Sequence, residues 1–103
     1  MRQPSEPVVL IAEFTARAGQ GDAVAALLAG LAAEVRREDG NVAFDCYRQT
    51  EAPEKFVVHE IYRDRAAFER HIAADYGAAF NTRLQQLIVE PHSMLTFLDP
   101  LRP

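Results

Sequence analysis

This sequence has little cysteine, no long apolar run and no cluster of basic residues. These features exclude several kinds of site and partner. Cys46 is the only cysteine among the 103 residues, which excludes an intrachain disulfide and a zinc site built on several thiolates. The longest apolar runs, such as residues 8–12, are far too short to cross a membrane. The net charge of −4 and the scattered arginines give no reason to expect a nucleic-acid partner. We therefore expect a cytoplasmic protein that binds neither membranes nor nucleic acid.

Length and composition predict one small globular domain. Apolar residues make up 49% of the chain and charged residues 25%, an ordinary balance for a globular protein. A chain of this length buries only about 60–70% of the surface that its unfolded form exposes. Burial against a second subunit would add substantial stability, so the size is compatible with an oligomer.

The spacing of apolar residues predicts the order strand, helix, strand, strand, helical pair, strand. The strands are expected at residues 8–15, 41–50, 55–63 and 92–98. Asp22, Asp64 and Asp75 are expected to cap the helices, and Pro91 to end the last one. Residues 1–7 are predicted to form a loose arm, residues 8–99 the folded domain, and residues 100–103 a tail.

This order is typical of an α+β, ferredoxin-like βαββαβ fold, with an antiparallel sheet and all helices on one face. In the first and third predicted strands, however, both faces are largely apolar. Val9, Ile11, Val57 and Ile61 share the face that the helices would leave open. We therefore expect a homodimer in which a second copy covers this face. The alternative is that isolated surface apolar residues need no partner.

Four short motifs follow one another in an informative order. They are Ile11-Ala12-Glu13-Phe14 in the first predicted strand, Asp39-Gly40-Asn41 before the second, Glu60-Ile61-Tyr62 in the third, and His71 in the helix that follows. In this order and spacing, over nearly the whole chain, the sequence resembles the antibiotic biosynthesis monooxygenase domain family. The resemblance implies a dimeric α+β barrel and, for several members, oxygenase activity with neither a metal nor an organic cofactor.

Two other branches of this family are similar by pattern. One is an isomerase of a phosphorylated quorum-sensing signal, which shares a tyrosine at the position of Tyr62. The other degrades haem with an asparagine, a tryptophan and a histidine, where this chain has Phe14, Tyr62 and Phe80. With no histidine at Phe80, haem degradation is not expected.

His71 and Glu60 are the candidate catalytic residues. An imidazole titrates near neutrality, and the position of His71 in its helix turns the ring towards the sheet, so we expect it to act as general base. Glu60 should project beneath the helices, where an unpaired charge is costly, and we expect it to orient His71. The alternatives are a histidine hydrogen-bonded for structure and an ion pair within the protein.

Aromatic residues are the candidates for substrate contact. Tyr62 and Tyr76 are expected to bind substrate, and Phe14 and Phe80 to form apolar walls, although each could instead fill the core. The three histidines show no metal-ligand spacing, so no metal site is expected.

Three hypotheses for function remain open. The first is a cofactor-independent monooxygenase that oxidises a small phenolic, quinol or polyketide-like substrate with dioxygen. The second is an isomerase or proton-transfer enzyme on a small carbonyl compound, for which an anionic substrate would demand arginines in the pocket. The third is a non-catalytic ligand-binding domain, which a pocket filled by its own side chains would favour.

Overall fold

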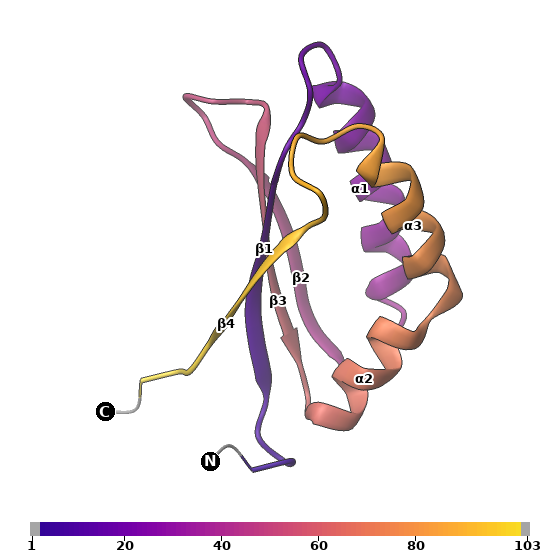
Figure 1. The fold of residues 1–103 in the computed structure, drawn as a ribbon. Helices are drawn as coiled ribbons and strands as arrows, with labels where there is room; N and C mark the ends of the chain where they lie inside the picture. Colours follow the sequence, from indigo (N-terminus) through magenta and orange to yellow (C-terminus); the bar gives the residue numbers. More distant parts are fainter. Residues whose placement is uncertain (1–2, 102–103) are drawn as a thin grey trace.

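The computed structural model describes residues 3–101, which form a four-stranded antiparallel sheet with helices on one side (Figure 1). The elements in chain order are β1 (Val8–Thr15), α1 (Gly21–Val35), β2 (Asn41–Arg48), β3 (Lys55–Tyr62), α2 (Arg65–Ala73), α3 (Asp75–Gln85) and β4 (Met94–Leu98). The strand order in the sheet is β2-β3-β1-β4, with every neighbouring pair antiparallel. The predicted α+β, ferredoxin-like fold is therefore confirmed.

The helix starts follow the sequence signals only in part. Asp64 caps α2 as predicted, because its carboxylate accepts a hydrogen bond from the Ala67 amide at 2.9 Å. The prediction for Asp22 is wrong, since α1 begins at Gly21 and Asp22 instead forms an exposed ion pair with Arg48 at 3.1 Å. Asp75 is the first residue of α3 and makes no capping hydrogen bond.

The chain ends fall partly outside the described residues, so the predicted arm at 1–7 and tail at 100–103 can be followed only in part. Within the arm, the Pro4 carbonyl accepts a hydrogen bond from the Arg65 amide at 3.2 Å. This bond ties the arm to the start of α2.

Side chains of β1 and β3 alternate between a buried face and a half-exposed face. The buried face packs against apolar residues of α1 and α3, and the core is completed by Phe44 of β2. Strand pairing sets Phe14 opposite Phe56, and their rings stack with centroids 5.7 Å apart. Further along the same face, Glu60 lies opposite Leu10. This register places Glu60 among apolar side chains beneath the helices.

The other face of the sheet carries no helix (Figure 1). Val9, Ile11, Val57 and Ile61 lie on it, and all four are half-buried. Every residue of β4, which pairs with β1, is exposed.

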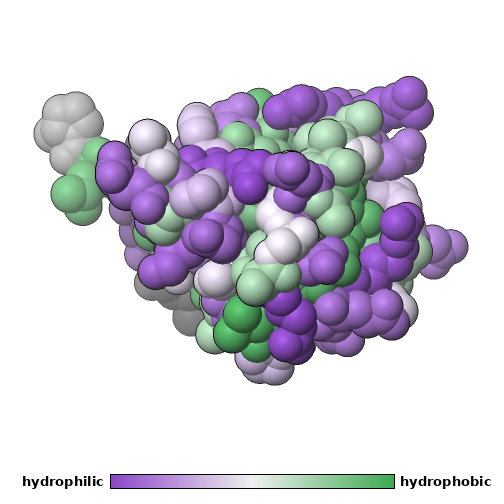
Figure 2. Space-filling view, turned by 90° about the horizontal axis from the view of Figure 1, so that it is seen from above, coloured by the Kyte–Doolittle hydropathy of each residue, from purple (hydrophilic) through white to green (hydrophobic). Residues whose placement is uncertain are grey.

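Seen from above, hydrophobic residues also reach the surface between hydrophilic ones at the end of the molecule (Figure 2). None of the helices formed by residues 3–101 is long and apolar enough to cross a membrane.

Gly40 lies where the turn after α1 packs closely against Ala67 of α2, with no room for a side chain. A Cβ added to it would lie 2.2 Å from the Cβ of Ala67 and 3.3 Å from its Cα. We expect Gly40→Ala to lower the free energy of unfolding by about 1–3 kcal/mol, because the backbone of α2 would have to shift. Urea unfolding measures this change.

Gly30→Ala is the matched control. Gly30 is exposed within α1, and a Cβ added to it would meet nothing within 4 Å. Alanine there should stabilise the helix by about 0.5–1 kcal/mol. Equal unfolding midpoints for the two variants would contradict the close approach at Gly40.

Candidate active site

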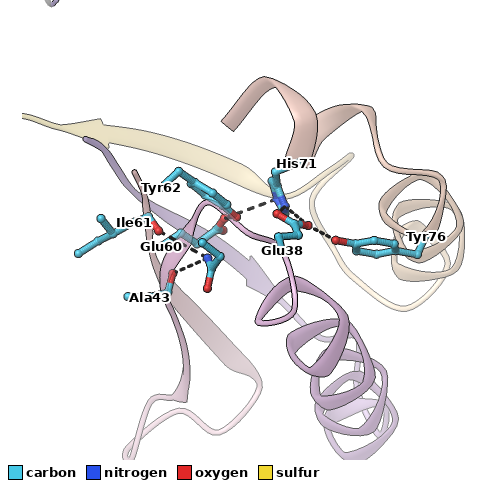
Figure 3. Close-up of polar contacts among 8 residues, drawn as sticks. Glu38, Ala43, Glu60, Ile61, Tyr62, His71 and Tyr76 are labelled. Carbon is cyan, nitrogen blue, oxygen red and sulfur yellow. Dashed lines mark hydrogen bonds and ion pairs between the residues drawn. The ribbon is translucent and has the colours of Figure 1, made fainter. Parts of the chain in front are cut away.

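His71, in the last turn of α2, lies between the carboxyl groups of Glu38 and Glu60 (Figure 3). Its Nδ1 atom is 3.0 Å from Oε2 and 3.2 Å from Oε1 of Glu38. Its Nε2 atom is 3.8 Å from Oε1 of Glu60. The ring also packs on that of Tyr62, with centroids 4.7 Å apart. His71 is thus fixed through Nδ1, while Nε2 faces Glu60 across a longer gap.

The Glu60 carboxyl is the one charged group buried in the core of the described residues, with 6% of its surface exposed. Removal from water raises its pKa above the ordinary value. The Tyr62 hydroxyl donates a hydrogen bond to it at 2.7 Å and, like the nearby His71, opposes this rise. Glu60 therefore holds a proton at a higher pH than an exposed carboxyl does.

Tyr62 is completely buried. Burial is the main reason that its pKa is raised, and the negative charge of Glu60 adds to the effect. The phenol consequently stays protonated and acts as a hydrogen-bond donor to Glu60 rather than as a base.

Glu38 joins His71 to α3. It lies in the turn after α1, and the Tyr76 hydroxyl donates a hydrogen bond to its Oε2 atom. Figure 3 shows the three side chains in line, with Glu38 between His71 and Tyr76. Helices α2 and α3 and the turn after α1 therefore meet at this carboxylate.

A cavity of about 250 Å³ lies between the sheet and the helices, with Glu60 and His71 in its wall. Its remaining walls are mostly apolar and include Phe14 and Phe80. Uncharged polar residues and one further histidine also line it, namely Asn81, Gln85, His92 and Ser93. A small apolar pocket with a few polar groups is typical of a ligand site. Within the described part of the chain, no group of three or more histidine, cysteine, aspartate or glutamate residues is placed to hold a metal ion.

The structure brings together some of the predicted site residues and separates others. Glu60 and His71 share the cavity with Phe14 and Phe80, as the sequence interpretation requires. Tyr62 and Tyr76 are not among the lining residues. The Tyr62 hydroxyl instead donates a hydrogen bond to Glu60, and the Tyr76 hydroxyl donates one to Glu38. The two tyrosines therefore position carboxylates and do not form the cavity wall.

Glu60 lies beside His71 as expected, but the carboxylate that is hydrogen-bonded to the imidazole is that of Glu38. Glu60 lies 3.8 Å from His71, beyond hydrogen-bond distance, whereas Glu38 lies within it. Sequence reasoning missed Glu38 because it follows two arginines and resembles a solvated helix end. The sequence did hold one signal, because a hairpin of the strands expected at 41–50 and 55–63 brings the turn before the first strand to the end of the second; the structure shows this as the pairing of Asn41 with Tyr62.

Similar solved structures cover almost the whole chain. Rv0793 from Mycobacterium tuberculosis is 30% identical, with a TM-score of 0.86 over 95% of this chain and 98% of that one. PA3566 from Pseudomonas aeruginosa is 29% identical, with a TM-score of 0.86 over 98% and 100%. A point mutant of SnoaB, a cofactor-independent oxygenase from Streptomyces nogalater, has the same fold at 21% identity, with a TM-score of 0.83 over 95% and 96%.

Comparison with curated proteins gives no match. The family model for antibiotic biosynthesis monooxygenase, in contrast, matches residues 7–90. This match spans β1 to α3 and includes Glu38, Glu60 and His71. The chain therefore belongs to the antibiotic biosynthesis monooxygenase family.

Proposed function

We propose that this protein is a cofactor-independent monooxygenase that oxidises a small, uncharged phenolic or quinol-like compound with dioxygen. The observation that carries the proposal is the pairing of His71 and Glu60 in the wall of a largely apolar cavity. His71 acts as the general base, and Glu60 is the acid–base group beside it. The description of SnoaB as a cofactor-independent oxygenase supports this proposal by analogy of fold.

The chemistry needs only a base, a dry pocket and an oxidisable substrate. Removal of a phenolic proton by His71 gives an electron-rich anion that can pass an electron to dioxygen. In a hydroquinone, hydroxylation of a ring carbon and oxidation of the ring to a hydroxyquinone together release four electrons; in a phenol, oxidation to a quinone releases the same number. One oxygen atom then enters the product and the other leaves as water, so no external reductant is required. The apolar walls keep bulk water away from the anion.

The charge of the cavity distinguishes this proposal from an isomerase of phosphorylated substrates. Among residues 3–101, no arginine or lysine lines the cavity, although bidentate arginine is the usual partner of a phosphate group. Two carboxyl groups lie at or behind its wall. These features favour an uncharged ligand. The open volume also argues against a domain whose pocket is filled by its own side chains.

His71→Ala is expected to lower the rate of quinol oxidation by about 10²–10⁴-fold, because the general base is lost. Oxygen uptake with a panel of hydroquinones and phenols measures the rate. Glu69→Ala is the matched control, since Glu69 is an exposed residue of the same helix. Equal oxygen uptake by His71→Ala and the wild type would refute the proposal. Turnover of a carbonyl substrate without oxygen would support the isomerase instead.

Glu60→Gln is expected to stabilise the fold near pH 7 by about 0.5–2 kcal/mol while lowering activity. Burial raises the pKa of Glu60 in the folded chain. The folded protein therefore binds the proton more tightly than the unfolded one, and the free energy of unfolding falls as pH rises from the unfolded pKa through the folded pKa. Glutamine keeps an acceptor for Tyr62 but carries no charge.

Thermal unfolding at a series of pH values measures this effect. The gain in Glu60→Gln should disappear towards about pH 4, where the unfolded carboxyl is also protonated. Glu51→Gln, in the exposed loop between β2 and β3, should show no such trend. A gain that does not depend on pH would contradict the assignment of the raised pKa to Glu60.

We propose further that two copies of the chain associate through the open face of the sheet and that the protein acts in the cytoplasm. The dimer is supported by the half-buried apolar residues Val9, Ile11, Val57 and Ile61 of β1 and β3, of which Val9 and Ile61 lie directly opposite each other. It is also supported by β4, where Met94 is 46% exposed and Leu98 37% exposed; they pair with Glu13 and Val9 and therefore share the open face. Such surfaces are usually covered by a partner.

Ile11→Arg is expected to convert the dimer to a monomer, because a guanidinium group would be buried in the apolar interface. Size-exclusion chromatography with light scattering should show the molecular mass fall by half. Ala26→Arg, at an exposed position on α1, should leave the mass unchanged. A wild-type protein that is monomeric at micromolar concentration would rule out this assembly.

A further inference from the structure

We propose that Glu38 is the positioning residue of His71, holding the imidazole in the tautomer that carries its hydrogen on Nδ1 and leaves the Nε2 lone pair facing Glu60. The catalytic consequence of this role rests on the proposed function. The tautomer itself does not, because it is a property of the resting protein. None of the motifs that indicated the family includes Glu38.

The hydrogen-bond geometry determines which ring nitrogen carries the hydrogen. Both oxygens of Glu38 lie within 3.2 Å of Nδ1, and a carboxylate can only accept hydrogen bonds. Nδ1 must therefore donate. In a neutral imidazole the other nitrogen then has a free lone pair, so Nε2 is the basic atom.

Tyr76 holds Glu38 in turn. Its hydroxyl donates to Oε2 of Glu38, the same oxygen that lies nearest Nδ1. Two donors from different helices thus converge on one carboxylate, while the ring of Tyr62 packs against His71. The hydrogen bond to Glu38 sets the direction in which Nδ1 points, and packing against Tyr62 sets the plane of the ring.

The position of Glu38 is not explained by helix stability. It follows the C-terminal end of α1, whose last turn carries no basic residue. A negative charge at that end opposes the helix dipole. Backbone hydrogen bonds from the Glu38 amide to Val35 and from the Asn41 amide to the Glu38 carbonyl hold the turn without the side chain. The carboxylate is therefore accounted for by its contacts with His71 and Tyr76.

Glu38 also acts at the moment of proton transfer. When Nε2 takes a proton, His71 becomes an imidazolium ion, and the neighbouring carboxylate stabilises its charge. Glu38 is not among the residues that line the cavity. Its effect should therefore appear in kcat, with little change in KM.

The first test is the tautomer of His71, measured by long-range ¹H–¹⁵N NMR above the pH at which the ring loses its charge. Comparison with His71→Ala assigns its signals among the three histidines. The wild type should show the Nδ1–H form. In Glu38→Gln the Tyr76 hydroxyl occupies the amide oxygen, so the amide NH2 group faces Nδ1 and donates to it, and the ring should change to the Nε2–H form. A wild-type ring with hydrogen on Nε2, or a tautomer unchanged in Glu38→Gln, would overturn the proposal.

The second test is kinetic. Glu38→Gln should lower kcat by at least 10–100-fold, by analogy with partners that orient catalytic or metal-binding histidines, with KM changed less than about twofold. Glu38→Asp keeps a carboxylate and should recover part of the loss. The matched control is Glu34→Gln, four residues earlier at the surface of α1, where Glu34 forms an ion pair with Arg37. Wild-type kcat in Glu38→Gln would refute the role.

Tyr76→Phe is the alternative variant for the kinetic test if Glu38→Gln does not fold. It removes only the hydroxyl that holds Glu38, so kcat should fall in the same direction but by less, and an unchanged kcat would count against the proposal. The proposed oxygenase function and the proposed role of Glu38 can fail independently of each other. If no phenol or quinol is oxidised by the wild type, the proposed function fails, and the NMR result alone decides whether Glu38 sets the tautomer.

Discussion

The burial of the Glu60 carboxyl is the constraint on which the site depends. Strand alternation turns this side chain into the core, where a charge without partners would be costly. The Tyr62 hydroxyl satisfies one oxygen, and His71 lies close enough to share the remaining electrostatic cost. A carboxyl whose pKa burial raises, placed beside an imidazole, has the composition of an acid–base pair. The same desolvation that destabilises the charge therefore makes the group chemically useful.

The helical layer contributes the second half of the site. The turn after α1, the last turn of α2 and the first turn of α3 meet where Glu38 contacts His71 and Tyr76. Gly40 makes this meeting possible, because any side chain there would push α2 away from the turn. A small displacement of α2 would move Nε2 relative to Glu60, and correct placement of the base is a large part of catalysis. Packing at Gly40 and proton transfer at His71 are thus linked through one helix.

The fold could be predicted from the sequence because its signals are local. Alternation in β1 and β3 is visible in the sequence itself, and the cap at Asp64 depends on residues three apart. Four residues of the cavity wall, Phe14, Glu60, His71 and Phe80, could be identified from the sequence because each faces inward from its strand or helix. The contact between His71 and Glu38 joins residues 33 positions apart and depends on how α2 packs over the turn. Whether Tyr62 lined the cavity or bonded to Glu60 was likewise decided by side-chain packing, which strand alternation does not specify.

The site and the open face of the sheet share the same strand. Along β3, Glu60 and Tyr62 point into the core, while His59 and Ile61, which alternate with them, point to the opposite face. A partner that covers Ile61 would remove water from the outer side of the strand that carries Glu60. It would also fix the pleat of that strand, and with it the direction of the carboxyl towards His71. Association through this face would therefore do more than bury apolar surface, because it would stiffen the strand on which the acid–base pair is built.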